Sequence, residues 1–109
     1  MVNFSRLSTI LAMIALASTA LEAAVVRGRV DRQTSYGITP AGSVKVTLKR
    51  TTSDNTSSPA FTDPRGYYYI YNALPGSYVL EVWNGPNRVT SSITVGNIPV
   101  FNAPTVTIR

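Results

Sequence analysis

The sequence predicts an all-β sandwich of about seven strands behind a short N-terminal leader. Val, Thr, Tyr and Ile dominate after residue 23, and apolar and polar residues alternate there in several runs. Gly, Pro, Asn and Asp interrupt these runs at short intervals, and no run has the 3.6-residue periodicity of an amphipathic helix. A chain of 109 residues has room for one domain.

Residues 1–23 have the order of a cleavable secretory signal peptide. One cation precedes an apolar run over residues 7–21, and small residues follow it. This run is shorter than the about 20 apolar residues of a membrane-spanning helix. Cleavage after Ala20 or Ala23 fits the pattern, and an uncleaved membrane anchor is the alternative. We therefore expect a secreted or periplasmic domain of residues 24–109 with no stable membrane span in its mature form.

Composition argues against catalysis and against a cofactor. The chain has no histidine and no cysteine, which removes the usual general base, the usual nucleophile and most zinc ligands. Its remaining carboxylates show no paired spacing of the kind a glycosidase needs. We therefore predict no enzyme activity, no metal and no cofactor. Although the net charge is +5, the cations are dispersed, so we expect no nucleic-acid partner and only a weak attraction to anionic envelope polymers.

Each predicted strand rests on alternation between turn residues. Asp63-Pro64-Arg65-Gly66 has turn-forming residues at each position, and Asn84-Gly85-Pro86-Asn87 is typical of a hairpin loop. Residues 33–42 and 51–58 are expected to be loops, and the segment between Pro99 and Pro104 to lie at an edge or outside the ladder. The expected strands are residues 24–31, 43–50, 59–62, 67–71, 77–83, 88–95 and 104–108.

The alternation also predicts which side chains are buried. Val44, Val46 and Leu48 share one face of their strand, with Lys45, Thr47 and Lys49 on the other, so one face of that sheet should be solvated. By the same rule, Tyr68 and Ile70 point inward, as do Tyr78, Leu80 and Val82. Gly28 weakens its strand unless another group lies against it closely.

The motifs resemble a known family when they are taken in order. They are Val26-x-Gly28-x-Val30, Val44-x-Val46-x-Leu48, Thr62-Asp63-x-x-Gly66-x-Tyr68-x-Ile70 and Pro75-Gly76-x-Tyr78-x-Leu80-x-Val82. The set resembles the carboxypeptidase-regulatory-like, transthyretin-related β-sandwich, a relative of the Cna protein B-type domain. The resemblance implies a prealbumin-like or Ig-like sandwich and a surface or secreted module that is usually non-catalytic and serves as a spacer or binding domain.

The chain departs from that family in several respects. The turn reads Asn72-Ala73-Leu74-Pro75-Gly76 where the family often has Asn-Leu-Pro-Pro-Gly, so Leu74 is expected to turn inward. Related ureide hydrolases depend on histidines, which this chain lacks. Cna protein B-type domains often form a lysine–asparagine bond. Here the candidate lysines lie on the outward side of a strand and are better interpreted as solvated surface groups. The candidates are Lys45 or Lys49, Asn97 or Asn102, and Glu81.

Four aromatic side chains form the candidate binding site. Tyr67, Tyr69 and Tyr71 alternate with the inward Tyr68 and Ile70, and Trp83 has the same parity on the next strand. The four rings are therefore expected to form one aromatic platform on a sheet face, suited to stacking on sugars. The alternative is that tyrosine occurs here because it is a good strand former.

The sequence thus predicts a non-catalytic exported module. Its ligand is expected to be carbohydrate, bound through the aromatic face. The alternative is a structural or assembly subunit of the cell envelope that acts by protein–protein contact, pairing edge strands with a partner protein. An enzyme inhibitor or accessory protein that acts through its loops is a third interpretation.

Overall fold

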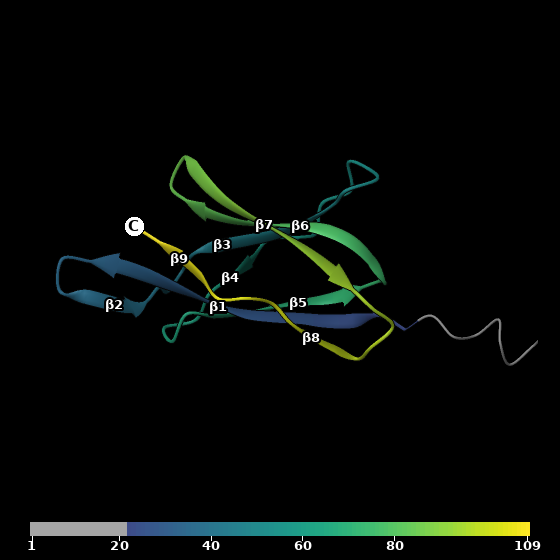
Figure 1. Ribbon diagram of the computed structural model, residues 1–109, viewed down its shortest axis with the longest axis horizontal. Helices are drawn as coiled ribbons and strands as arrows, with labels where there is room; N and C mark the ends of the chain where they lie inside the picture. Colours follow the sequence, from purple (N-terminus) through teal and green to yellow (C-terminus); the bar gives the residue numbers. More distant parts are fainter. Residues whose placement is uncertain (1–21) are drawn as a thin grey trace, which may run out of the picture.

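The computed structural model describes residues 22–109, and the predicted leader lies outside this part except for its last two residues. The described residues contain nine β-strands and no helix, so they include no helix that could cross a membrane. The all-β prediction is confirmed (Figure 1). The strands are β1 (Ala24–Thr34), β2 (Gly37–Pro40), β3 (Lys45–Arg50), β4 (Ala60–Phe61), β5 (Tyr67–Ala73), β6 (Gly76–Asn84), β7 (Asn87–Val95), β8 (Val100–Asn102) and β9 (Val106–Ile108).

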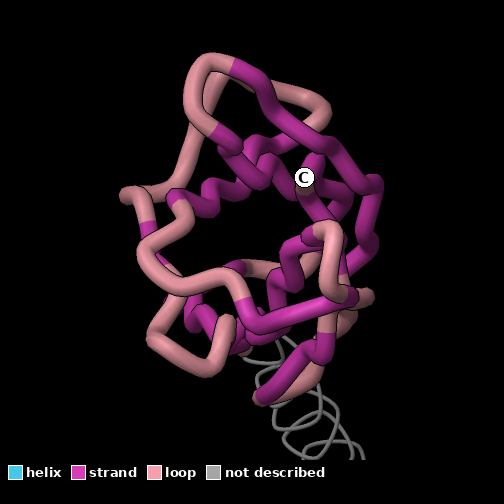
Figure 2. The backbone as a smooth tube through the Cα atoms, turned by 90° about the vertical axis from the view of Figure 1, so that its left-hand side faces the viewer, coloured by secondary structure: helices cyan, strands magenta, loops and turns pink. Residues whose placement is uncertain are grey.

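The strands form two sheets that face each other (Figure 2). The first sheet contains β2, β1 and β5, with β8 and β9 on the other side of β1. The second sheet has the order β4-β3-β6-β7. Each sheet buries its apolar face against the other, which is the sandwich that the alternation predicts.

Strand β1 organises the first sheet because it is long enough to pair with four other strands. Its first half pairs antiparallel with β5, with Val26 opposite Ile70, and parallel with β8. Its second half pairs antiparallel with β2 and parallel with β9, where Val30 lies opposite Val106. The far end of β1 and β2 form a hairpin that projects from the sandwich, at the left of Figure 1.

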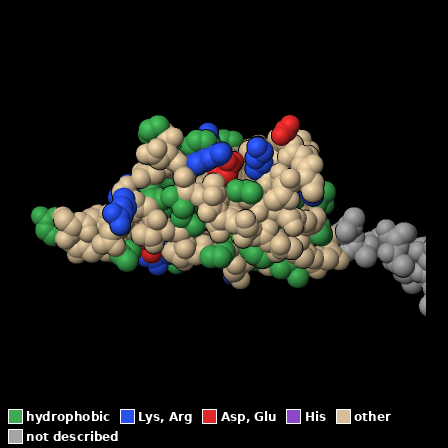
Figure 3. Space-filling model, turned by 45° about the horizontal axis from the view of Figure 1, so that its top comes forward, with side chains coloured by type: hydrophobic (Ala, Val, Ile, Leu, Met, Phe, Trp, Pro, Cys, Tyr) green, Lys and Arg blue, Asp and Glu red, His purple; other side chains and the backbone are tan. Residues whose placement is uncertain are grey.

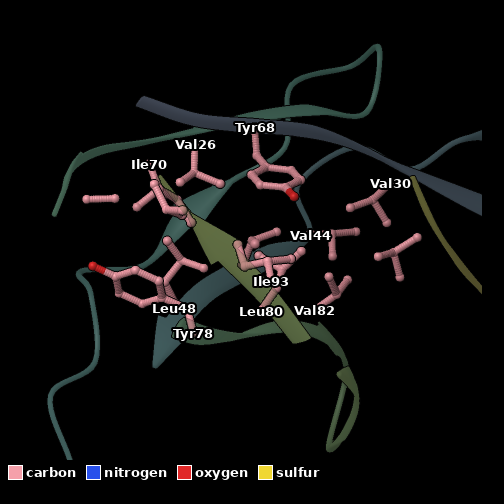
Figure 4. Packing of buried hydrophobic residues seen from close by; sticks show 14 of the residues in the cluster. Val26, Val30, Val44, Leu48, Tyr68, Ile70, Tyr78, Leu80, Val82 and Ile93 are labelled. Carbon is pink, nitrogen blue, oxygen red and sulfur yellow. The ribbon is translucent and has the colours of Figure 1, made fainter. Parts of the chain in front are cut away.

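The core lies between the sheets and draws on both (Figure 4). Tyr68 is 1% exposed, and its ring lies over Gly28, where an added Cβ would come 2.4 Å from the phenol oxygen. Glycine thus makes room for the largest fully buried side chain. The inward orientations predicted from alternation are confirmed for Val44, Val46, Leu48, Tyr68, Ile70, Tyr78, Leu80 and Val82, and Val26 and Val30 are buried with them.

The turn before β5 is held by one aspartate. The Asp63 carboxylate accepts hydrogen bonds from the backbone N–H groups of Arg65 (2.9 Å) and Tyr67 (3.0 Å). Gly66 has φ of 83°, and a Cβ there would come 2.4 Å from the carbonyl oxygen of Val30. The predicted turn is therefore confirmed, and it sets where β5 begins.

One prediction about the fold is wrong. Residues 33–42 are not all loop, because β1 runs on to Thr34 and pairs with β2. The segment between Pro99 and Pro104 lies at an edge of the first sheet, as the sequence predicts, and includes the short strand β8.

The corner between β5 and β6 also differs from the sequence-based expectation. Leu74 is 50% exposed instead of turned inward, while Ala73 is buried. The Leu74 carbonyl accepts a 2.6 Å hydrogen bond from the Tyr78 hydroxyl. The corner is thus closed by Tyr78, whose hydroxyl holds the Leu74 backbone in place.

Candidate functional site

Strand β5 presents a row of tyrosines on the outer face of the first sheet. Tyr67, Tyr69 and Tyr71 are 40%, 45% and 65% exposed, whereas Tyr68 and Ile70 between them are buried. The row follows from strict alternation in a strand whose other face is core. These side chains are exposed as the sequence predicts.

Arginines from β1 lie beside this row. Arg27 is the register partner of Tyr69, and Arg29 that of Tyr67. The Arg29 guanidinium lies 5.8 Å from the centroid of the Tyr67 ring, within cation–π distance. It also forms a 2.7 Å ion pair with Asp31, and that hydrogen bond and charge raise the pKa of Arg29.

Strand β8 completes the site on the far side of β1. The Asn102 side-chain oxygen accepts a 2.6 Å hydrogen bond from Arg27 Nε, which orients the Arg27 side chain without neutralising its charge. A hollow of about 450 Å³ lies over these strands. We call this hollow, together with the tyrosine rings that border it, the tyrosine face. It is lined by Arg27, Gly28, Arg29, Tyr67, Tyr69, Asn102, Ala103 and Thr105.

Trp83 does not belong to this face, so the predicted four-ring platform is wrong. Strand β6 pairs with β3 and β7 in the second sheet, whereas β5 pairs with β1 in the first. Trp83 therefore lies on the opposite outer face of the sandwich from Tyr67, Tyr69 and Tyr71. The chain changes sheets at a corner with two positive φ angles, 62° at Asn72 and 154° at Gly76. A tight turn between two strands ordinarily makes neighbours of them, and here it does not.

Trp83 instead takes part in a network on the second sheet. Its indole N–H donates to the Thr47 hydroxyl (3.3 Å), and Lys45 and Arg88, its register partners on either side, lie 5.1 and 5.7 Å from its ring centroid. Glu81 is buried although it is on the outer face. It accepts a 3.0 Å hydrogen bond from Thr47 and pairs with Arg88. Figure 3 shows Lys and Arg side chains beside an acidic one on this side of the molecule.

A second hollow, of about 600 Å³, lies beside that network. The loop that follows β3 forms one wall, and the outer faces of β6 and β7 form the floor. Lys49, Arg50 and Arg88 contribute cations, but Arg88 is paired with Glu81 and Arg50 lies 5.1 Å from the centroid of the Tyr78 ring. Two of the three cations are therefore already engaged, and among residues 22–109 no aromatic residue lines this hollow.

The structure places Lys45 and Asn102, two of the candidates for a lysine–asparagine bond, in different sheets. Lys45 lies over the Trp83 ring in the second sheet, while Asn102 bonds Arg27 in the first. Glu81 is engaged by Thr47 and Arg88. In the part of the chain that the structure describes, no three His, Cys, Asp or Glu residues lie close enough to hold a metal ion.

Sequence reasoning found the tyrosines but missed the polar half of the site. Arg27 and Arg29 were recognisable as outward residues of the first strand, but nothing in the sequence placed that strand beside the tyrosines. Asn102 lies within the proline-flanked edge segment, and nothing in the sequence placed it beside the tyrosines, because its pairing with β1 is parallel and joins residues 75 positions apart.

Comparisons of the sequence with known families and characterised proteins gave no match. No family model matches the chain, and no curated protein does. The fold, in contrast, is shared with solved structures.

A proposed carbohydrate-binding protein of Pseudomonas aeruginosa has a TM-score of 0.59 and 15% identity, over 81% of this chain and 90% of that one. GBS52, the minor pilin of Streptococcus agalactiae, has a TM-score of 0.62 and 11% identity over 83% of this chain, which spans only 46% of the pilin. A cohesin–X-dockerin complex of Acetivibrio cellulolyticus matches 77% of this chain and 56% of that one, at 18% identity and a TM-score of 0.46. The first two likenesses establish a shared β-sandwich fold.

Proposed function

We propose that this protein is an exported, non-catalytic module that binds carbohydrate through the tyrosine face. The observation that carries the proposal is the row of half-exposed tyrosine rings beside a hollow with polar groups of its own. Flat aromatic rings stack on the apolar faces of sugars, and contiguous exposed rings usually indicate contact with a ligand. Export is inferred from the predicted leader, residues 1–23.

The polar groups of this face suit a sugar as well. Arg27 offers guanidinium donors, and the Tyr69 hydroxyl both donates and accepts. Arg27 is oriented by Asn102, whereas Asp31 holds Arg29 beside Tyr67. The fold's likeness to a proposed carbohydrate-binding protein is compatible with this function and adds no residue to it.

The test compares two tyrosines that differ in location. Binding of the exported protein to a glycan array and to isolated envelope polysaccharide would be measured for Tyr69→Ala and for Tyr36→Ala. Tyr36 is the matched control, because it is 99% exposed at the tip of the β1–β2 hairpin, away from the tyrosine face. We expect Tyr69→Ala to weaken binding about tenfold or more, equivalent to about 1.4 kcal/mol, and Tyr36→Ala to leave it unchanged. The absence of any glycan ligand, or equal losses in both variants, would refute the proposal.

The alternative function, assembly by protein–protein contact, is favoured by a different observation. Strand β7 is a long edge strand with an open side, and edge strands can accept a strand from another chain. This surface lies in the second sheet, so it does not compete with the tyrosine face.

A further inference from the structure

Most edge strands of this sandwich are protected against pairing with another chain. Short length and proline are common means of protection, and both occur here. Strand β4 has two residues, and β8 and β9 have three each, with Pro99 and Pro104 beside them. Strand β2 has four residues and ends at Pro40. Strand β5 is occupied at its start, where Asp63 bonds both the N–H and the C=O of Tyr67.

Strand β7 has none of these protections. It runs for nine residues, Asn87–Val95, and pairs with β6 along its whole length without a bulge. Within residues 22–109 no strand pairs with its other side. It contains no proline and no lysine, and Arg88 is its one charged residue. A regular edge of this length is a template for a further strand.

The hairpin fixes which backbone groups face the open side. Only Gly85 and Pro86 join Asn84 to Asn87, and Gly85 has φ of 63°. A two-residue loop makes its flanking residues a hydrogen-bonded pair, and such pairs alternate along an antiparallel ladder. The N–H and C=O groups directed away from β6 are therefore those of residues 88, 90, 92 and 94.

We propose that β7 pairs antiparallel with β7 of a second copy of this chain, about a two-fold axis at Ser91. Thr90 then lies opposite Ser92 of the second copy, and Arg88 opposite Thr94. All the outward groups of residues 88, 90, 92 and 94 find partners in this register, and the two four-stranded sheets become one sheet of eight strands.

The occupant is a second copy because the strand is complementary to itself. The two Arg88 side chains fall at opposite ends of the pair, so no like charges face each other. Val89 points to the inner side yet is 41% exposed, and in this register it meets Ile93 of the second copy. Its apolar surface is thereby covered.

The dimer would present both tyrosine faces in the same direction. A two-fold axis that relates antiparallel neighbours in one sheet is perpendicular to that sheet, so the outer faces of the two first sheets point the same way. On a polymeric glycan the two sites can then bind together, which raises the overall affinity without any new contact. This consequence rests on the proposed carbohydrate function, whereas the pairing itself does not.

Two single-cysteine variants test the register, because the chain has no native cysteine. At the two-fold axis the Ser91 residues form a non-hydrogen-bonded pair with Cα atoms about 4.5 Å apart, within the range of a disulfide. The two Ser92 residues are about 8 Å apart, from the strand spacing and rise, which is too far. We expect Ser91→Cys to give a disulfide-linked dimer on mild oxidation and Ser92→Cys to remain unlinked. Equal cross-linking, or none in Ser91→Cys, would contradict the register.

A proline tests the edge itself. Ser92→Pro removes an N–H that faces the open side and leaves the ladder to β6 complete. We expect the purified exported protein to sediment as a dimer and Ser92→Pro as a folded monomer, with folding checked by circular dichroism. A monomeric wild type at its highest soluble concentration, or a dimer that survives Ser92→Pro, would overturn the proposal.

The two proposals fail separately. If the dimer forms but no glycan binds, the carbohydrate function is wrong and the pairing stands. If glycan binds to a protein that is monomeric throughout, the pairing is wrong. If both hold, Ser92→Pro binds a short oligosaccharide as the dimer does and binds the polymer at least tenfold more weakly.

Discussion

At the scale of residues, the close contact between Gly28 and Tyr68 constrains the core. A Cβ at position 28 would come 2.4 Å from the phenol oxygen and 2.7 Å from Cζ of a side chain that is almost completely buried. We expect Gly28→Ala to lower the free energy of unfolding by about 1–3 kcal/mol, the usual cost of overpacking. Gly96→Ala is the control, because a Cβ there meets nothing within 4 Å. Equal urea midpoints for the two variants would show that the ring can move aside.

The Tyr68 hydroxyl makes the folded protein less stable in alkaline solution. It is buried, and among the described residues it has no hydrogen-bond partner. Burial raises the pKa of Tyr68 to about 12, from 10.0 in its unperturbed form. The unfolded chain therefore loses this proton first as the pH rises.

The free energy of unfolding therefore keeps its full value below pH 10 and falls as the pH rises toward 12. The loss reaches up to about 2.7 kcal/mol, because each unit of pKa difference between the folded and unfolded chain corresponds to about 1.36 kcal/mol. We expect Tyr68→Phe to remove this part of the alkaline decline. At neutral pH the variant should be at least as stable as wild type, since no hydrogen bond is lost. Denaturant titrations from pH 8 to 12 would measure both effects, and parallel declines would contradict the assignment to Tyr68.

At the scale of elements, Asp63 determines how β5 starts. Its carboxylate accepts from two backbone N–H groups, those of Arg65 and Tyr67. We expect Asp63→Ala to destabilise the protein by about 1–2 kcal/mol, because both N–H groups lose their acceptor. Asp63→Asn should keep most of the wild-type stability, because its amide oxygen can accept the same hydrogen bonds. Thermal unfolding of the pair would decide this. An asparagine variant as unstable as the alanine variant would mean that the charge, and not the acceptor, matters.

Most elements were predictable from sequence because they rest on local alternation and turn residues. Val44, Val46 and Leu48 define β3, and Tyr68 and Ile70 define β5, without reference to any partner strand. β2 and β8 were missed because they are short and gain stability only from β1, which is distant in sequence from β8.

Only the tyrosine half of the candidate site could be predicted, again because alternation is a local property of one strand. Exposure of Tyr67, Tyr69 and Tyr71 follows from alternation within one strand. The position of Trp83 depends on which sheet β6 joins, and the corner at Asn72 and Gly76 decides that through two unusual φ angles. The contribution of Arg27 and Asn102 depends on strand order, which alternation does not encode.

At the scale of the whole molecule, the outer faces of the two sheets differ in character. The outer face of the first sheet is left with exposed rings and an unneutralised arginine, which suits a ligand. On the outer face of the second sheet, Trp83, Glu81, Arg88 and Thr47 interact with one another, and no strand of residues 22–109 pairs with the outer side of β7. The proposed binding surface and the proposed assembly surface therefore do not overlap.

The central claim is that ligand binds on the first sheet and not at Trp83, and NMR mapping tests it most directly. Isotope-labelled protein would be titrated with a glycan selected on the array, and shifts followed at the Tyr67 and Tyr69 rings, the Arg27 Nε–H and the Trp83 indole N–H. The account predicts saturable changes at Tyr67, Tyr69 and Arg27, with the Trp83 signal unmoved. Changes centred on Trp83, with the tyrosine face silent, would contradict it.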